Sequence, residues 1–265
     1  MEMVRGFDCV VHLFEETPAF GEADEVDRRI VNAGCIKALV NAIKQSNPHT
    51  KLIYMSSAGV NGPTQKFAPP VNALTELNPV SKYAAGKAAA EKEIIDSGID
   101  HCILRMSEIF ASPGKFPDDM LGILFDHPLE ARNEAITDLD AARALAAAAY
   151  DSLTSGNVMS KILYIAGGGE NGWQLMNREL MPAIFDAMGI GMLDEECFIK
   201  DLSSYSMDWY DTAESGRLLD YKKHSFDDYI DSVRAHTQKG GAAMRLMAPR
   251  LKKTMESMSP YRSRD

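Results

Sequence analysis

Apolar residues follow two distinct patterns along the chain. Short runs rich in β-branched residues, such as "DCVVHLF", are typical of strands buried in a parallel sheet. Longer segments place apolar residues three or four positions apart, which predicts helices with one apolar face. Predicted strands cover residues 8–14, 51–60, 99–110 and 161–167, and predicted helices cover residues 22–46, 81–98, 136–153 and 173–188.

The order of these elements predicts the fold class. The first five read β-α-β-α-β, which indicates an α/β fold with a parallel sheet covered by helices. A loop-rich insertion is expected over about residues 108–134, and residues 240–265 form a basic, methionine-rich helix or tail. We expect a first domain over residues 1–165 and a smaller C-terminal substrate-binding region with this basic tail over residues 166–265.

Composition excludes several classes of protein. The formal net charge of −10 argues against a general nucleic-acid binder, which needs Lys and Arg for phosphate contacts. The four cysteines are scattered without a C-x-x-C pair, so the sequence predicts neither a metal site nor a disulfide framework. No signal peptide or membrane-length apolar run is visible. We therefore expect a cytoplasmic protein that acts on a small molecule and binds no membrane.

One helix and one strand end carry candidate chemistry. Tyr83 and Lys87 lie four positions apart in a predicted helix, so both side chains are on one face. A nearby cation favours the phenolate form of a tyrosine and brings it closer to acid–base use. Ser56 and Ser57 end the preceding strand, at the sheet edge where parallel sheets bind ligands. Alone, the Y-x-x-x-K spacing describes a solvated helix face more often than a catalytic pair.

Five segments taken in order resemble the extended short-chain dehydrogenase/reductase family, the NAD(P)-dependent epimerases and dehydratases. That family has a strand ending in His-Leu-Ala-Ala, a helix with an Asn, a strand ending in Ser-Ser-x-x-Val-Tyr-Gly, a Tyr/Lys helix and a strand ending in Leu-Arg. The matching segments are "FDCVVHL", "VNAGCIKALVNAI", "KLIYMSSAGVNG", "SKYAAGKAAAEKEI" and "HCILRMSEIF". The resemblance covers residues 7–110, continues more weakly to about residue 235, and implies a Rossmann-like sheet.

The resemblance also implies a role for each matching residue. Tyr83 matches the catalytic acid/base, and Lys87 matches the lysine that binds the nicotinamide ribose and lowers the pKa of that tyrosine. Ser57 matches the serine that polarises the substrate oxygen, because it lies three residues before Val60, and Ser56 is the close alternative. The implied cofactor is NAD or NADP.

Further positions match the cofactor site and the subunit contact of the family. Phe14 falls where the family has a small alanine beside the cofactor, and Met106 and Ser107 match backbone positions near the nicotinamide. Asn32 matches the helix asparagine of the family. An equally good interpretation is that its side chain only connects the helix to neighbouring backbone. The helices that contain Asn32 and Tyr83 pair in the family as a four-helix bundle, which predicts a homodimer.

The glycine-rich phosphate loop of the family is missing from its expected place. The family begins with that loop, whereas "MEMVRGF" leads directly into what matches the fourth strand, so a β-α-β-α-β unit of about sixty residues is absent. The fold is thus expected to be N-terminally truncated. "GGGENG" contains G-x-G-x-x-G at Gly167, Gly169 and Gly172, but it follows the Tyr/Lys helix and precedes a poor strand. We interpret it as a look-alike.

Two departures bear on function. "HLFEE" replaces the small alanines, and Glu108 stands where sugar-nucleotide epimerases often carry Asn. A carboxylate there would repel a diphosphate, which argues against a nucleotide-sugar substrate. The leading hypothesis is an NAD(P)-dependent oxidoreductase of the epimerase/dehydratase type. The alternatives are a non-catalytic binding or regulatory remnant of that family, and a fragment destabilised by its exposed strand edge.

Overall fold

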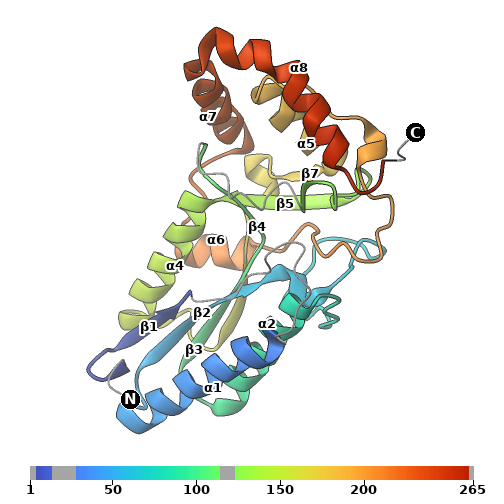
Figure 1. Ribbon diagram of the computed structural model, residues 1–265. Helices are drawn as coiled ribbons and strands as arrows, with labels where there is room; N and C mark the ends of the chain where they lie inside the picture. Colours follow the sequence, from blue (N-terminus) through green and yellow to red (C-terminus); the bar gives the residue numbers. More distant parts are fainter. Residues whose placement is uncertain (1–3, 14–27, 114–122, 263–265) are drawn as a thin grey trace.

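The computed structural model describes residues 4–13, 28–113 and 123–262, and the side chains of residues 28–33 and 241–246 are outside this description. The main sheet has four parallel strands in the order β1-β2-β3-β6. They are β1 (Cys9–His12), β2 (Lys51–Ser57), β3 (His101–Met106) and β6 (Lys161–Ile165). The predicted Rossmann-like α/β fold with a parallel sheet covered by helices is confirmed (Figure 1).

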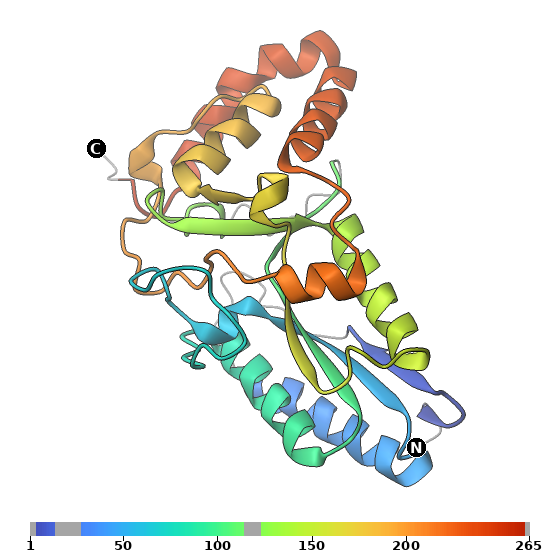
Figure 2. The ribbon, with the colours of Figure 1, turned by 180° about the vertical axis from the view of Figure 1, so that it is seen from behind.

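Helices cover both faces of this sheet (Figures 1 and 2). On one face, Ile43, Leu52 and Ile103 are fully buried, and burial of each such side chain contributes about 1.5–3 kcal/mol. On the other face, Leu104 and Ala144 belong to a second buried cluster. The first layer consists of α1 (Arg28–Ser46) and α2 (Lys82–Ser97), and the second of α4 (Asp138–Leu153) and α6 (Ala213–Leu219).

Local sequence explains where two of these helices begin and end. Ser81 precedes α2, and its side chain accepts a hydrogen bond from the Ala84 amide at 3.1 Å. Gly98 ends α2 in the left-handed conformation, with φ of 70°. Thr137 caps α4 in the same way, through the Asp140 amide at 3.1 Å. Both helices therefore lie where the sequence predicted them.

A second, three-stranded sheet lies beyond the carboxyl end of the first. Its strands are β4 (Glu108–Phe110), β5 (Arg132–Thr137) and β7 (Gln174–Met176), with β4 parallel and β7 antiparallel to β5. It lies in the same part of the molecule as α5 (Asn177–Ala187), α7 (Phe226–Lys239) and α8 (Gly241–Met258) (Figure 1). Buried Trp173 packs between the sheet and α7, with its ring 5.3 Å from that of Phe226.

This sheet corrects two of the predicted elements. The strand expected over residues 99–110 divides at Ser107, because β3 pairs with β6 whereas β4 pairs with β5. The helix expected from Trp173 begins only at Asn177, because residues 174–176 pair with β5. A capping hydrogen bond from the Met176 amide to Glu179 then starts the helix. Of residues 240–265, expected as helix or tail, residues 241–258 are helical in α8.

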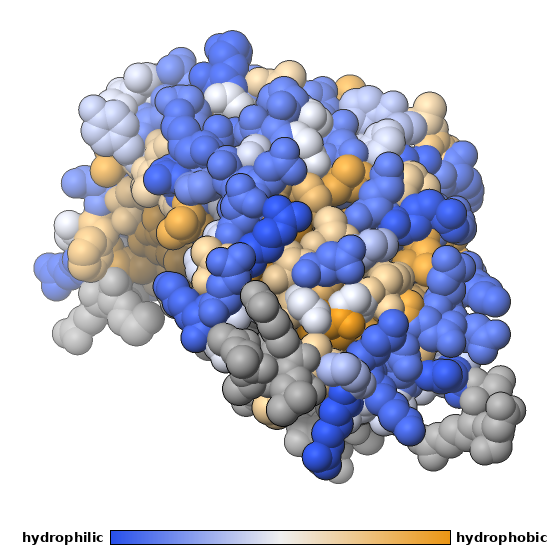
Figure 3. Space-filling view, turned by 90° about the horizontal axis from the view of Figure 1, so that it is seen from above, coloured by the Kyte–Doolittle hydropathy of each residue, from blue (hydrophilic) through white to orange (hydrophobic). Residues whose placement is uncertain are grey.

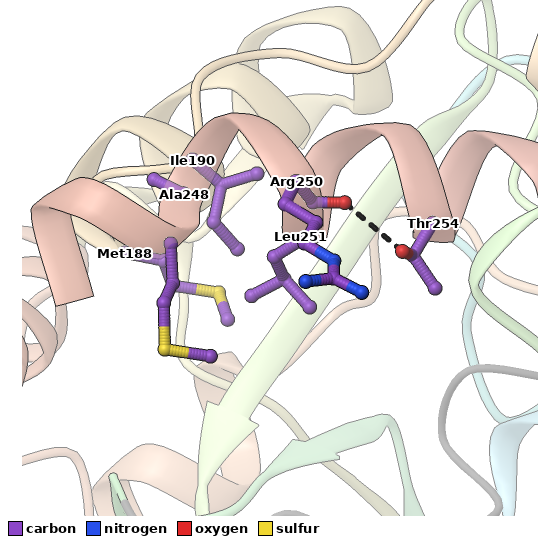
Figure 4. Close-up of a pocket in the computed structure, with 7 residues that line it drawn as sticks. Met188, Ile190, Ala248, Arg250, Leu251 and Thr254 are labelled. Carbon is purple, nitrogen blue, oxygen red and sulfur yellow. Dashed lines mark hydrogen bonds between the residues drawn. The ribbon is translucent and has the colours of Figure 1, made fainter. Parts of the chain in front are cut away.

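The end of the molecule formed by α5, α7 and α8 is mainly polar, with apolar residues exposed in patches (Figure 3). One small groove of about 180 Å³ lies between the end of α5 and α8, lined by Met188, Ile190 and Leu251 (Figure 4). Among the described residues, no helix is long and apolar enough to cross a membrane.

Candidate active site

The carboxyl end of β2 carries the Ser57 hydroxyl. Ser57 pairs in register with Met106 of β3 and is 7% exposed. Its side chain accepts a hydrogen bond from the Gly59 amide at 3.1 Å and so caps the 3-10 turn Ala58–Asn61. Because Ser57 Oγ is the acceptor in this hydrogen bond, the bond leaves the hydroxyl proton available to a substrate oxygen.

The turn after β2 packs against the start of α2. A Cβ atom added at Gly59 would lie 3.3 Å from the Ser57 Oγ and 4.0 Å from the Cβ of Ala84. Ala84 follows Tyr83 directly. The fold therefore brings the Ser57 hydroxyl to the end of α2 that carries Tyr83.

Lys87 is buried beneath this end of the sheet. Its side chain is among the largest with less than 2% relative exposure, and its Nζ donates a hydrogen bond to the Met55 carbonyl at 2.6 Å. The same Nζ lies 5.9 Å from the centre of the Tyr83 ring and 5.1 Å from that of Tyr54. A buried cation held between two aromatic rings is positioned to stabilise negative charge on a phenol.

Ser56, the alternative to Ser57, has a different environment. Its hydroxyl donates to the Glu91 carboxylate at 2.5 Å. Glu91 in turn forms a buried ion pair with Arg105, with 2.8 Å between Arg105 Nη2 and Glu91 Oε2. Ser56 therefore ties β2 to α2, and the hydroxyl nearer the sheet edge belongs to Ser57.

His12 is a neighbour of this cluster that sequence reasoning missed. It ends β1, in register with Tyr54, and the two rings lie 5.7 Å apart. Burial lowers the pKa of His12, and the positive charge of Lys87 lowers it further. In the sequence, His12 lies within the predicted strand 8–14 and matches the histidine of the family's His-Leu-Ala-Ala strand end, but neither signal placed it beside Lys87.

The nicotinamide end of the implied cofactor can be tested against these residues. Within the described part of the chain, His12 Nδ1 and Ser107 Oγ are buried polar atoms without a hydrogen-bond partner. They lie at the ends of β1 and β3, on either side of the strand that carries Ser57. Because unpaired buried polar atoms cost free energy, a polar ligand at this edge would stabilise them. These residues fit the ribose–nicotinamide end of the cofactor. Phe14, the other residue predicted to lie beside it, is outside the described residues.

The glycine-rich loop does not offer a cradle for the pyrophosphate. The Gly168 amide donates to the carboxylate of buried Glu134 at 2.8 Å, and the Gly167 amide donates to the Ala135 carbonyl at 2.9 Å. These donors are satisfied within the protein, and the Glu134 carboxylate beside them would repel a phosphate. A Cβ atom at Gly167 would meet the Trp173 ring at 2.2 Å, so this glycine is needed for packing. The geometry agrees with the interpretation of the motif as a look-alike.

Glu108 is neutralised by a partner that the sequence did not reveal. Its carboxylate lies 3.0 Å from His127 Nε2 and accepts a hydrogen bond from the Asn133 amide at 2.8 Å. Burial acts to lower the pKa of His127, but the Glu108 charge and hydrogen bond raise it overall. Burial likewise acts to raise the pKa of Glu108, and His127 lowers it overall. The two groups form an ion pair at the start of β4.

Comparisons with known proteins identify a family and a fold for this chain. The model of the NAD dependent epimerase/dehydratase family matches residues 1–148. A comparison with curated proteins gives no match.

Several solved structures share the fold. A UDP-glucuronic acid 4-epimerase from Bacillus cereus has a TM-score of 0.72 and 17% identity, over 90% of this chain and 77% of that one. A short-chain dehydrogenase/reductase superfamily protein from Agrobacterium tumefaciens has a TM-score of 0.71 and 16% identity, over 92% of this chain and 84% of that one. The UDP-Glc/GlcNAc 4-epimerase from Campylobacter jejuni has a TM-score of 0.67 and 19% identity, over 88% of this chain and 77% of that one. At these identities the likeness concerns the fold.

Proposed function

Because the chain belongs to the NAD-dependent epimerase/dehydratase family, we propose that it is an NAD(P)-dependent oxidoreductase of the epimerase/dehydratase type. Its substrate would be a small molecule with a hydroxyl or carbonyl group. The observation that carries the proposal is the buried Lys87 ammonium 5.9 Å from the Tyr83 ring, at the sheet edge that also presents Ser57.

Each of these three residues has a role in that chemistry. The Ser57 hydroxyl donates a hydrogen bond to the reacting oxygen of the substrate and fixes its position. The Tyr83 hydroxyl transfers a proton to or from the same oxygen. The Lys87 ammonium stabilises the negative charge that Tyr83 carries after it gives up its proton. When bound, the nicotinamide would accept or supply a hydride. Among the described residues, Lys87 would bind its ribose, and Tyr83, Met106 and Ser107 would lie near the nicotinamide.

A second candidate is a non-catalytic binding or regulatory member of the family. The observation that favours it is the glycine-rich loop, whose Gly167 and Gly168 amides are bonded to protein acceptors. Such a protein would keep the Ser57 and Tyr83 site without binding the dinucleotide.

Cofactor titration separates the two candidates. The purified chain is titrated with NAD⁺, NADH, NADP⁺ and NADPH by calorimetry. Lys87→Ala removes the buried ammonium, and Lys92→Ala is the matched control, because Lys92 lies on the same helix with a side chain that is 75% exposed. Saturable binding in the wild type and in Lys92→Ala, but weakened at least tenfold in Lys87→Ala, supports the oxidoreductase.

The opposite result would favour the binding protein. If the folded wild-type chain gives no heat with any of the four dinucleotides at millimolar concentration, this polypeptide does not carry out the hydride chemistry by itself. Circular dichroism of each variant establishes that the comparison is between folded proteins.

The family also supports a homodimer through α1 and α2. α1 and α2 pack against each other along the same face of the sheet (Figure 1). Ile95 of α2 and Val80 just before it are 46% and 48% exposed, which leaves apolar surface for a second copy.

A further inference from the structure

A second cleft contains none of the candidate active-site residues in its lining. It has a volume of about 660 Å³, within the roughly 300–1,000 Å³ typical of small-molecule sites. Its walls come from four places that are distant in sequence. They are residues 69–70, residues 169, 170 and 174, residues 209–213, and Lys222. The polar and aromatic groups of these walls indicate what the cleft binds.

The glycine-rich loop forms one wall. A Cβ atom at Gly168 would lie 2.5 Å from the Glu170 carboxylate, and one at Gly169 would lie 2.7 Å from the Gln174 side-chain oxygen. Without a Cβ atom at either position, the loop backbone lies this close to the two side chains without displacing them. The motif that does not cradle a phosphate therefore places a carboxylate and an amide beside the cleft.

Hydrogen bonds orient these polar groups. The Gln174 amide donates to buried Glu134 at 3.0 Å. The Lys222 ammonium donates to the Glu170 carboxylate at 2.6 Å and to the Thr212 hydroxyl at 2.7 Å. Groups that are already oriented lose little conformational freedom when a ligand binds, so this wall is prepared for hydrogen bonding.

Another part of the lining is aromatic and apolar. Trp209 lines the cleft together with Pro69 and Pro70. Its indole nitrogen donates to the Leu175 carbonyl at 3.2 Å, and the guanidinium of Arg132 lies 6.0 Å from the ring centre. The indole is therefore anchored at its edge and supported by a cation, which fixes a flat surface for packing against C–H groups.

The charges in the cleft exclude an anionic ligand. Glu170 and Asp211 contribute two carboxylates, whereas Lys222 contributes one ammonium that is already paired. Although partial burial acts to raise the pKa of Glu170, the hydrogen bond from Lys222 lowers it overall, so the carboxylate is an acceptor at neutral pH. A phosphate or carboxylate ligand would be repelled, and a neutral ligand rich in hydroxyl donors would be favoured.

We infer that this cleft binds the pyranose ring of a neutral sugar. Its hydroxyl groups hydrogen-bond to Glu170, Asp211 and Gln174, and its C–H face packs on the indole of Trp209. A pyranose combines one apolar face with a rim of hydroxyl groups, which matches a lining that combines an indole with carboxylates and an amide.

Titration of the full chain with three sugars tests this site. D-Glucose, D-galactose and N-acetyl-D-glucosamine are added at millimolar concentrations, and binding is followed by calorimetry and by tryptophan emission. The chain has two tryptophans, and because Trp173 is only 1% exposed, a change in emission reports Trp209. We expect saturable binding of at least one sugar, accompanied by an emission change.

Variants locate the binding. Trp209→Ala and Glu170→Gln should each weaken sugar affinity at least tenfold, as measured by calorimetry on protein that circular dichroism shows to be folded. Lys87→Ala should leave the affinity unchanged, since Lys87 belongs to the candidate active site.

Four results would overturn the inference. They are the absence of binding of all three sugars to the folded wild type, unchanged affinity in Trp209→Ala and Glu170→Gln, loss of binding in Lys87→Ala, and saturable binding of uridine in place of the sugars. The last would indicate that the indole stacks on an aromatic base.

Discussion

The ammonium of Lys87 lies one helical turn from Tyr83, 5.9 Å from the centre of its ring, and is anchored to the Met55 carbonyl at 2.6 Å. This anchor fixes the cation on β2 as well as on α2. The helix that carries the proposed acid/base is thus joined to the strand that carries Ser57. Substitutions that keep this frame and remove one reacting atom therefore report on chemistry rather than on folding.

Tyr83→Phe removes the proton-transferring hydroxyl and retains the ring beside Lys87. With any substrate that the wild type converts, we expect kcat to fall by about 10²–10⁴, the usual contribution of a positioned acid or base. The affinity for the dinucleotide should stay within about threefold, because the ammonium is intact. Turnover measured by nicotinamide absorbance, together with calorimetric cofactor titration, checks both parts. A decrease of less than tenfold in kcat would remove Tyr83 from the proposed mechanism.

Gly59→Ala should disturb Ser57 directly. The added methyl group would lie 3.3 Å from the Ser57 Oγ, a contact that requires the hydroxyl to shift. We expect a loss of about 1–2 kcal/mol in the free energy of unfolding and a decrease in kcat. Gly34→Ala is the control: nothing lies within 4 Å of the added atom in α1, so it should stabilise the protein by about 0.5–1 kcal/mol. Urea unfolding of both variants gives the comparison, and equal behaviour would contradict it.

The buried Glu91–Arg105 pair should be costly to break from one side. Both side chains are almost fully buried, at 1% and 3% exposure, and Ser56 adds a hydrogen bond to the same carboxylate. Arg105→Met leaves an unpaired carboxylate in the core, so we expect a loss of about 3–5 kcal/mol.

Two further variants test this explanation by chemical denaturation. The double variant Glu91→Leu with Arg105→Met should recover most of that loss, because no charge stays buried. Lys92→Ala, which breaks the exposed pair with Asp96, should leave stability unchanged. A double variant as unstable as Arg105→Met would show that packing, and not the charge, dominates.

Local sequence was sufficient for some of these features and insufficient for others. The bounds of α2 followed from Ser81 and Gly98, because a cap acts on its immediate neighbours. The division of residues 99–110 between two sheets was not visible, since Glu108 acquires its strand partner Ala135 only in the folded chain. Ion pairs between residues distant in sequence were likewise not visible before folding.

The pairing of Glu108 with His127, nineteen residues away, has no signature in sequence. The expectation that Glu108 would carry an unbalanced negative charge therefore omitted its counter-ion. Similarly, the place of the glycine motif in the chain argued against a phosphate loop, but its contacts with Gln174 and Glu170 required the folded structure.

The His127–Glu108 pair should make stability depend on pH in two directions. The pKa of folded His127 is raised above its usual 6.5, so its contribution is complete below that value and is lost as pH rises through the folded pKa. The pKa of folded Glu108 is lowered from its usual 4.5, so its contribution is present above that value and is lost as pH falls through the folded pKa. The pair should therefore stabilise the protein most between about pH 4.5 and 6.5.

The variant His127→Gln tests this window. Urea unfolding across a pH series should show that the difference in stability between wild type and variant is largest within it and smaller at alkaline pH. A difference that is constant with pH would mean that His127 contributes by packing alone.

Assembly through α1 and α2 gives a prediction that is independent of activity. Ile95 is 46% exposed on α2, and Ile→Glu at this position would place a charge in an interface between two copies. We expect the wild type to be a dimer at micromolar concentration and Ile95→Glu to be a monomer, as measured by light scattering or sedimentation. Tyr150→Glu on α4 is the matched control, because Tyr150 is 72% exposed on a helix that covers the opposite face of the sheet. A dimer that persists in Ile95→Glu and dissociates in Tyr150→Glu would place the contact on the α4 side. A monomeric wild type would contradict the prediction of a dimer formed by a four-helix bundle.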